Sequence, residues 1–183
     1  MQGYKGWDES DRKTTMDPDV ILPKAGLKPG MTLVDIGCGQ GYFAIPAARI
    51  AGKKGRVYGI DIDEEALELL GRKASEAGLD IKVITGEGEK TIACEGCADI
   101  VFFGICLHDF EAPEKVLANA RRMLKPGGTL ANLDWKKAEM QGGPPVEARL
   151  SERQASKLIA DAGLKVQSAE DISGRYYLIL AKK

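Results

Sequence analysis

A strand-like segment that ends in alternating glycines constrains the fold of this chain more than any other feature. Residues 31–36 are mostly apolar or β-branched, and Gly37, Gly39 and Gly41 follow at every second position. Glycine adopts positive φ angles easily and leaves bare backbone against which a ligand can lie. A helix predicted from Tyr42 onward would aim free N–H groups at an anionic part of that ligand. The segment therefore predicts a strand, a tight turn and a helix, with a ligand site at the carboxyl end of the strand.

Strands and helices alternate along the rest of the chain. Hydrophobic runs bounded by glycines predict strands at 31–36, 56–60, 80–85, 99–105, 129–135, 165–169 and 176–181. Capping residues and periodicity predict helices at 17–22, 42–51, 63–78, 113–124 and 151–162, the first of them interrupted by Pro23. The expected fold is α/β in three layers: a doubly wound, seven-stranded, mostly parallel sheet with a C-terminal antiparallel strand pair. We expect one domain over residues 1–183, with residues 1–16 as a flexible segment or a lid.

The charge balance and the apolar content limit the classes of partner. Lys and Arg total 26 against 27 Asp and Glu, so a broad basic face for DNA is not expected. No apolar stretch reaches the roughly 20 residues of a membrane helix, and the first residues lack the apolar core of a signal peptide, so we expect a cytoplasmic protein. In that compartment the four cysteines, Cys38, Cys94, Cys97 and Cys106, are expected to be free thiols. The Cys94/Cys97 pair supplies only half a zinc site, so no metal site is predicted.

The spacing of the glycines argues against two classes of nucleotide-binding protein, the dinucleotide-binding proteins and the Walker-type proteins. In a dinucleotide fingerprint the third glycine or alanine comes one residue later, at the place that Tyr42 occupies here. No Gly-Lys-Ser/Thr follows, so a Walker-type phosphate site is also absent from the sequence. Asp61 lies about 20 residues beyond the turn at the end of the second predicted strand, where a carboxylate can accept hydrogen bonds from ribose hydroxyls. A nucleotide-dependent oxidoreductase is therefore a disfavoured alternative.

Five motifs in order give the chain a family resemblance. They are Asp35-x-Gly37-x-Gly39-x-Gly41, Gly59-Ile60-Asp61-Ile62, Gly86-Glu87-Gly88, Ala98-Asp99-Ile100-Val101 and Arg122-Met123-Leu124-Lys125-Pro126-Gly127-Gly128-Thr129-Leu130. With these motifs residues 17–135 resemble the class I S-adenosylmethionine-dependent methyltransferases, and within them the small type 11 branch that includes ubiquinone/menaquinone C-methyltransferases. The resemblance implies a Rossmann-like methyltransferase fold with S-adenosyl-L-methionine as cofactor and S-adenosyl-L-homocysteine as product.

The resemblance also implies which residues hold each part of the cofactor. Asp35 and the backbone of Gly37, Cys38 and Gly39 would hold the methionine part. Asp61 would accept hydrogen bonds from the ribose hydroxyls, and Ile62 would pack on the adenine face. Glu87, with Gly88 beside it, would accept from the adenine amino group, although the family more often has Asp there. The backbone of Gly104 and Ile105 would line the channel through which the methyl group is presented.

The methyl acceptor is expected to be a small molecule that the sequence does not identify. His108, the single histidine, follows the fourth predicted strand and is a candidate general base; the alternative is a packing or helix-entry residue. Lys136, Lys137 and Arg149 could recognise an anionic acceptor, although a solvated loop face is favoured for them. The acceptor pocket could depend on residues 4–15 or on a second subunit, so a homodimer is one expectation. A non-catalytic cofactor-binding protein stays open as an alternative.

Overall fold

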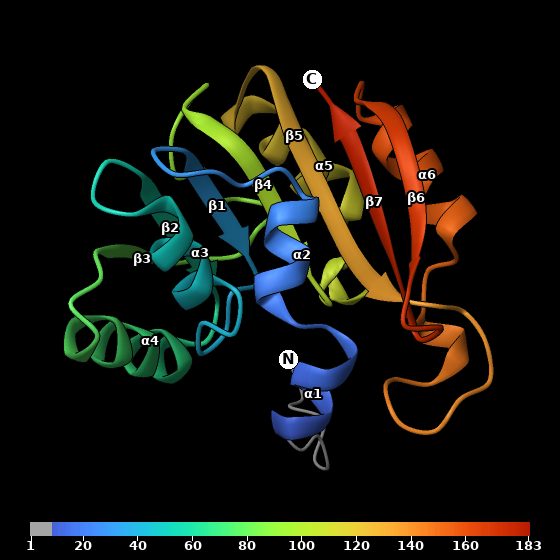
Figure 1. Ribbon diagram of the computed structural model, residues 1–183. Helices are drawn as coiled ribbons and strands as arrows, with labels where there is room; N and C mark the ends of the chain where they lie inside the picture. The colour runs from blue at the N-terminus through green and yellow to red at the C-terminus, as the bar shows by residue number, and fades with distance from the viewer. Residues whose placement is uncertain (1–8) are drawn as a thin grey trace.

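One seven-stranded sheet forms the centre of the computed structural model, which describes residues 9–183 (Figure 1). Its strands are β1 (Thr32–Ile36), β2 (Arg56–Asp61), β3 (Ile81–Thr85), β4 (Ala98–Gly104), β5 (Leu124–Trp135), β6 (Lys165–Ile172) and β7 (Tyr176–Lys182). Their order in the sheet is β3-β2-β1-β4-β5-β7-β6. Strands β1 to β5 are parallel, and β7 is antiparallel to both β5 and β6. The predicted doubly wound sheet with a C-terminal antiparallel pair is confirmed.

Helices cover both faces of this sheet. The helices are α1 (Glu9–Thr15), α2 (Pro18–Lys24), α3 (Ala44–Ala51), α4 (Glu64–Glu76), α5 (Pro113–Met123) and α6 (Glu152–Asp161), with short 3-10 helices η1 (Leu107–Asp109) and η2 (Val146–Ala148). Figure 1 shows α2, α3 and α4 on one face of the sheet and α5 and α6 on the other. Side chains of the first three helices join one apolar cluster, and those of α5 and α6 join a second cluster. Successive residues of the central strand β4 alternate between the clusters, as Phe102 and Phe103 show.

Local capping interactions fix where the helices begin. The Asp63 side chain accepts a hydrogen bond from the Ala66 amide at 3.0 Å and starts α4. Ser151 and Gln154 form a complete capping box at the start of α6. Both starts were predicted from the sequence, because a cap depends only on residues that are close along the chain.

Several predicted boundaries differ from the structure, and two of the differences have a clear physical reason. Strand β5 begins at Leu124 rather than at residue 129, because Leu124 pairs with Ala98 of β4 before the register shifts ahead of Ile100. Residues 125–128, which separate the predicted helix from the predicted strand, are thus the irregular start of that strand. Helix α2 continues past Pro23 to Lys24, because a proline so close to the helix end removes only one helical hydrogen bond.

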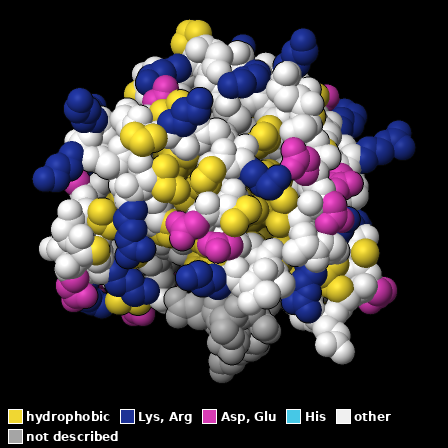
Figure 2. All heavy atoms as spheres, in the orientation of Figure 1, with side chains coloured by type: hydrophobic (Ala, Val, Ile, Leu, Met, Phe, Trp, Pro, Cys, Tyr) yellow, Lys and Arg dark blue, Asp and Glu magenta, His cyan; other side chains and the backbone are white. Residues whose placement is uncertain are grey.

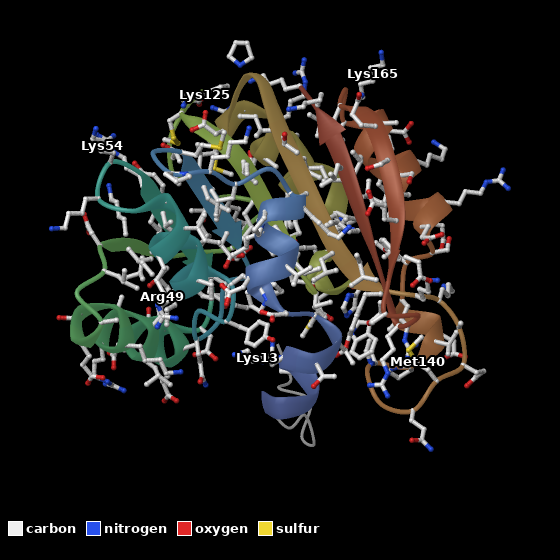
Figure 3. The ribbon with its side chains drawn as sticks, in the orientation of Figure 1. Lys13, Arg49, Lys54, Lys125, Met140 and Lys165 are labelled. Atoms are coloured by element: carbon white, nitrogen blue, oxygen red, sulfur yellow. A yellow bond between two sulfur atoms is a disulfide. The ribbon has the colours of Figure 1, made fainter. Side chains whose placement is uncertain are left out.

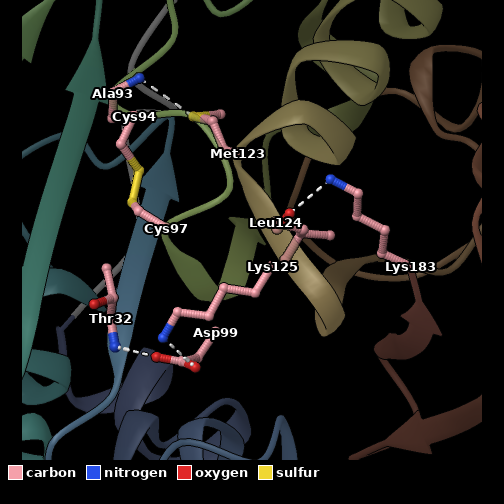
Figure 4. The surroundings of a disulfide bond; sticks show 9 residues. All are labelled: Thr32, Ala93, Cys94, Cys97, Asp99, Met123, Leu124, Lys125 and Lys183. Carbon is pink, nitrogen blue, oxygen red and sulfur yellow. Dashed lines mark hydrogen bonds and ion pairs between the residues drawn. A yellow bond between two sulfur atoms is a disulfide. The ribbon is translucent and has the colours of Figure 1, made fainter.

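A disulfide joins Cys94 and Cys97 in the loop between β3 and β4 (Figure 4). The expectation of four free thiols is therefore wrong for this pair, whereas Cys38 and Cys106 are free and buried. Gly96 has a φ of 57° and lets the chain turn so tightly that the two Cα atoms lie 5.9 Å apart. The bond lies near the amino end of β4, beside Met123 of α5, at the opposite end of the strand from the glycine turn.

The N-terminal region is described in part. Residues 1–8 lie outside the described residues, and Glu9–Thr15 forms α1. A role of residues 1–16 as a lid stays a prediction. Among residues 9–183, no helix combines the length and the apolar character that crossing a membrane requires.

Candidate functional site

The glycine turn lies where the strand order reverses. Strand β1 has β2 on one side and β4 on the other, so chain segments that leave its carboxyl end diverge from those of β4 and open a crevice. Gly37, Gly39 and Gly41 have φ angles of 72°, 49° and 88°, a region that other residues rarely adopt. A side chain at Gly41 would also collide with Leu70 of α4. The alternating glycines are therefore required by the backbone itself, as the sequence predicted.

Asp61 ties this turn to the end of β2. One carboxylate oxygen accepts a hydrogen bond from the Gly39 amide at 2.7 Å, and the other accepts from the Asp63 amide at 3.0 Å. Only 4% of Asp61 is exposed. Because each carboxylate oxygen has a further lone pair, the same group can also accept from a ligand hydroxyl.

Asp35 is a buried carboxylate one residue before the end of β1. Among the described residues its Oδ2 atom has no hydrogen-bond partner. Burial raises the pKa of Asp35 well above its usual range, and the nearby charge of Asp61 raises it further. A buried carboxylate with a spare oxygen is suited to a cationic ligand group, since leaving it unpaired carries an energetic penalty.

A cleft of about 650 Å³ opens at the carboxyl ends of β1, β2 and β3. Five predicted cofactor residues line it: Gly37, Asp61, Ile62, Glu87 and Gly88. Its volume is within the range of about 300–1,000 Å³ that is usual for small-molecule sites.

Ile62 and Glu87 have different surroundings in this cleft, and their roles toward adenine stay predictions. Ile62 is 50% exposed and lines the cleft, so its apolar side chain is available to pack on a flat ring. Glu87 instead turns to Lys90, with which it forms an exposed ion pair at 2.6 Å. Pairing with adenine would require Glu87 to exchange part of that ion pair.

The other five predicted cofactor residues do not line this cleft: Asp35, Cys38, Gly39, Gly104 and Ile105. Cys38 is buried, and burial raises the pKa of its thiol, so it stays protonated. Gly104 packs directly under the Phe43 ring, where a Cβ atom would lie 2.6 Å from that ring. Ile105 has a φ of 62°, a rare conformation for a β-branched residue that is often found at functional sites.

Sequence reasoning missed part of the cleft wall. Asp109, Phe110 and Glu111, which follow β4, line it together with the ends of β1 to β3. The signal was present, because the carboxyl ends of adjacent parallel strands meet at one edge of the sheet. Asp109 does not cap the helix that follows, because the N-cap of α5 is Ala112.

His108 is buried beside two carboxylates. Its Nδ1 lies 2.7 Å from Oδ1 of Asp134, near the end of β5, and its Nε2 lies 3.3 Å from Oδ1 of Asp109. The His108 side chain has no exposed area, and no histidine appears on the face of the molecule in Figure 2. The ring is therefore held by Asp134, whereas Nε2 has no hydrogen-bond partner among the described residues, and His108 does not itself line the cleft.

Arg149 does not face an anionic acceptor in this structure. It is 3% exposed and donates hydrogen bonds to the backbone carbonyls of Pro144, Lys136, Ala138 and Gly142. Its guanidinium also lies 5.2 Å from the centre of the Trp135 ring. Arg149 thus holds the loop between β5 and α6 in shape, and the interpretation of Arg149 as part of a solvated loop face is wrong.

A second cleft of about 500 Å³ lies on the outer side of the glycine turn, beside Gln40 and Gly41. Lys13 of α1 and Arg49 of α3, both labelled in Figure 3, line it. Asp19 lines it too, so its charge is mixed. None of the predicted cofactor residues belongs to it.

Comparison with known proteins identifies the family. A family model described as "Methyltransferase domain" matches residues 27–174. A SAM-dependent methyltransferase structure from Aquifex aeolicus is 33% identical, with a TM-score of 0.90, and the match covers 96% of this chain and 93% of that one. The chain therefore belongs to the methyltransferase domain family and is a small class I member of it.

Curated relatives match a shorter region. The probable cobalt-precorrin-6B C(15)-methyltransferase (decarboxylating) of Pyrobaculum calidifontis is 39% identical over 108 residues, which are 58% of this chain and 54% of the relative. The demethylmenaquinone methyltransferase of Bacillus velezensis is 27% identical over 145 residues, which are 76% of this chain and 62% of the relative. The chain thus spans about half the length of the curated relatives it matches. The resemblance to menaquinone-type methyltransferases is confirmed, and the cofactor of the family is S-adenosyl-L-methionine.

The residues of the site fit this cofactor. Asp35 offers a buried carboxylate oxygen to a cationic group, and Asp61 offers oxygen atoms to hydroxyls. At Gly39 no atom lies within 4 Å of where a Cβ would be, so the turn leaves open space for a ligand.

Proposed function

We propose that the chain transfers the methyl group of S-adenosyl-L-methionine to a small-molecule acceptor. The observation that carries the proposal is that Gly37, Asp61 and Ile62 line one cleft at the point where the strand order reverses. The cleft is therefore lined by exposed backbone, by a carboxylate that can accept hydrogen bonds from hydroxyl groups, and by an exposed apolar side chain.

Each side chain has a distinct part in holding the cofactor. Asp61 would accept hydrogen bonds from the ribose hydroxyls while its bond to the Gly39 amide keeps the turn in place. Ile62 would pack on the adenine ring, and Glu87 and Gly88 would border its amino edge. Asp35 would face the positively charged methionine end, because its Oδ2 is the buried acceptor still available there.

The chain's own contribution to the reaction is placement. When bound, the cofactor supplies an activated methyl group on a sulfonium. Backbone at Gly104 and Ile105, at the end of β4, would border the path between the methyl group and the acceptor, with the strained φ of Ile105 fixing its direction. Holding reacting atoms in line can supply about 7–11 kcal/mol of the barrier.

A thermal-shift comparison tests the proposal against its rivals. S-adenosyl-L-homocysteine at 100 times its dissociation constant should stabilise the chain by about 2.7 kcal/mol. NAD at the same concentration should give no shift. A shift with NAD alone would favour the oxidoreductase alternative and contradict the proposal.

Methyl transfer separates an enzyme from a cofactor-binding protein. Incubation with labelled S-adenosyl-L-methionine and a pool of small metabolites should yield labelled product and S-adenosyl-L-homocysteine. Binding without product in every pool would support the non-catalytic alternative. We also propose that the chain forms a homodimer, which sedimentation would test. We propose that it is located in the cytoplasm, which cell fractionation would test. DNA is not among the proposed acceptors, and a DNA-methylation assay would test this.

A further inference from the structure

The loop between β3 and β4, residues 86–97, joins the cofactor cleft to the disulfide. Its first part lines the cleft with Glu87 and Gly88, and the bond between Cys94 and Cys97 closes its last part. Strands β3 and β4 point the same way, because every neighbouring pair from β3 through β2 and β1 to β4 is parallel. The loop therefore returns from the carboxyl edge of the sheet, where the cleft lies, to the amino edge.

Helix α5 contacts both parts of this loop. Nδ2 of Asn119 donates a hydrogen bond to the Gly88 carbonyl at 3.0 Å, in the cleft wall. About one helical turn further along, the Met123 sulfur accepts a hydrogen bond from the Ala93 amide at 3.3 Å, next to the disulfide (Figure 4). The helix thus connects the backbone beside the disulfide with the backbone beside the cofactor site.

The short turn that the disulfide closes is held by the same end of α5 and is open to solvent. The Gly96 amide donates to the Arg122 carbonyl at 3.0 Å, and the Glu95 carboxylate pairs with the Arg122 guanidinium. Glu95 and Gly96 are exposed, and Cys94 and Cys97 are half-buried. A dithiol in solution can therefore reach the bond.

The disulfide closes too short a loop to hold the fold together. Its cysteines are three positions apart, and the stabilisation from a cross-link grows with the length of chain that it closes. Strand β4, which follows, is held independently by its pairing with β1 and β5. In the cytoplasm, where we propose that the chain is located, disulfides are usually transient and redox-sensing. Breaking this bond should thus loosen the loop and leave the sheet intact.

We propose that Cys94 and Cys97 form a reversible redox site, and that their disulfide form binds the cofactor more tightly than their dithiol form because α5 couples the pair to Gly88. The inference rests on the proposed position of the cofactor in the cleft. While the bond is intact, the loop has few conformations before a ligand arrives. The dithiol form loses more conformational freedom when it binds, so its affinity is lower. Cys38 and Cys106 are buried outside this loop and take no part.

The reductant is a dithiol, and the exchange balances without a further reactant. One of its thiolates attacks a sulfur of the pair, the bond between Cys94 and Cys97 breaks, and the leaving sulfur takes the electron pair and a proton. The second thiol of the reductant then attacks the mixed disulfide and releases the other cysteine as a thiol. Two electrons and two protons pass to the protein, and the reductant leaves as a disulfide. The oxidised form of the same dithiol reverses the exchange.

Calorimetry with S-adenosyl-L-homocysteine compares the two forms directly. Wild-type chain reduced with dithiothreitol should bind it roughly fivefold or more weakly than the disulfide form. The double variant Cys94→Ser with Cys97→Ser should bind like the reduced wild type. Because this variant keeps Cys38 and Cys106, it is the matched control, and dithiothreitol should not change its affinity. Equal affinity of the two wild-type forms would overturn the proposal, whether or not the variant folds.

Thermodynamic linkage sets a second requirement on the same pair. If the ligand prefers the disulfide form, saturating S-adenosyl-L-homocysteine must raise the ratio of reduced to oxidised dithiothreitol at half-reduction by the same factor as the affinities differ. Alkylation of the thiols and mass measurement follow this titration. A bond that dithiothreitol does not reduce in the folded chain, or a half-reduction ratio that ignores the ligand, would contradict the redox site.

The route through α5 is tested by removing its contact with Gly88. Asn119→Ala loses the hydrogen bond to the Gly88 carbonyl, so the affinities of the disulfide and dithiol forms should become nearly equal while the bond stays reducible. Lys115→Ala, an exposed change on the same helix, should keep the full difference. A difference that survives in Asn119→Ala as well would overturn the coupling through this helix.

Hydrogen exchange follows the loop without any ligand. Reduction should speed amide exchange at residues 86–90, in the cleft wall, as well as at residues 93–97 beside the cysteines. Faster exchange confined to residues 93–97 would contradict the coupling. A chain that binds S-adenosyl-L-homocysteine in neither form contradicts the proposed function, whereas one that binds it equally in both forms contradicts the redox site alone.

Discussion

The Asp61 carboxylate accepts a hydrogen bond from the Gly39 amide at 2.7 Å, so the end of β2 holds the turn that follows β1. Strands β1 and β2 are neighbours in the sheet, yet these two residues are 22 positions apart in the sequence. The carboxylate proposed to bind ribose therefore also shapes the backbone proposed to bind methionine. Both halves of the site depend on one side chain.

Replacing Asp61 with alanine should weaken cofactor binding and leave the chain folded. Hydrogen bonds to a charged group contribute about 1.5–3 kcal/mol, so S-adenosyl-L-homocysteine affinity should fall roughly 10- to 150-fold by calorimetry. Asp80→Ala, an exposed carboxylate just before β3, is the control and should bind normally. Equal affinity in both variants would remove Asp61 from the cofactor site.

Gly41 and Gly26 provide a matched test of the glycine turn. Both have a φ near 90°, but a Cβ at Gly26 meets no atom within 4 Å, whereas at Gly41 it meets Leu70 and Ile45. Alanine carries about 1–2 kcal/mol of backbone strain at either position. In urea unfolding, the free energy of unfolding should fall by about 1–3 kcal/mol more for Gly41→Ala than for Gly26→Ala, because the helix contacts must also shift. Equal losses would show that the turn is not tightly packed.

Asp35→Asn should stabilise the cofactor-free chain at neutral pH and weaken cofactor binding. Burial, and then the charge of Asp61, raise the pKa of Asp35 in the folded state. The folded chain therefore holds this proton more tightly than the unfolded chain. The stability from Asp35 is present below about pH 4 and is lost as pH rises through the folded pKa.

Unfolding measurements between pH 4 and pH 8 check that sign. The stability advantage of Asp35→Asn over the wild type should be largest near pH 8 and should shrink toward pH 4. An advantage that grows on acidification would mean that the folded pKa of Asp35 is lowered instead.

Arg149→Lys should loosen the loop between β5 and α6. A lysine cannot reproduce the planar guanidinium that donates to Pro144, Ala138 and Gly142 together. We expect a loss of about 2–4 kcal/mol in the free energy of unfolding and faster hydrogen exchange over residues 136–150. Arg153→Lys, an exposed change on α6, should stay within about 0.5 kcal/mol of the wild type.

Most of the fold could be predicted because its signals are local. The apolar run before Gly37 and the caps at Asp63 and Ser151 each involve residues within a few positions of one another. The start of β5 at Leu124 could not be predicted, because it depends on pairing with Ala98, a residue distant in the sequence. The disulfide between Cys94 and Cys97 was missed because the expectation followed from the compartment rather than from the turn at Gly96.

The glycine turn, the acidic residue at the end of β2 and the family were determined by the sequence alone, because backbone conformation and ligand chemistry restrict the residue types at those positions. Only the tertiary structure decided that Asp109 faces the cleft, that Arg149 is buried under its own loop, and that His108 is paired with Asp134. These relationships join residues on different strands and loops. Their distances follow from the order and register of the sheet, which no local pattern in the sequence records.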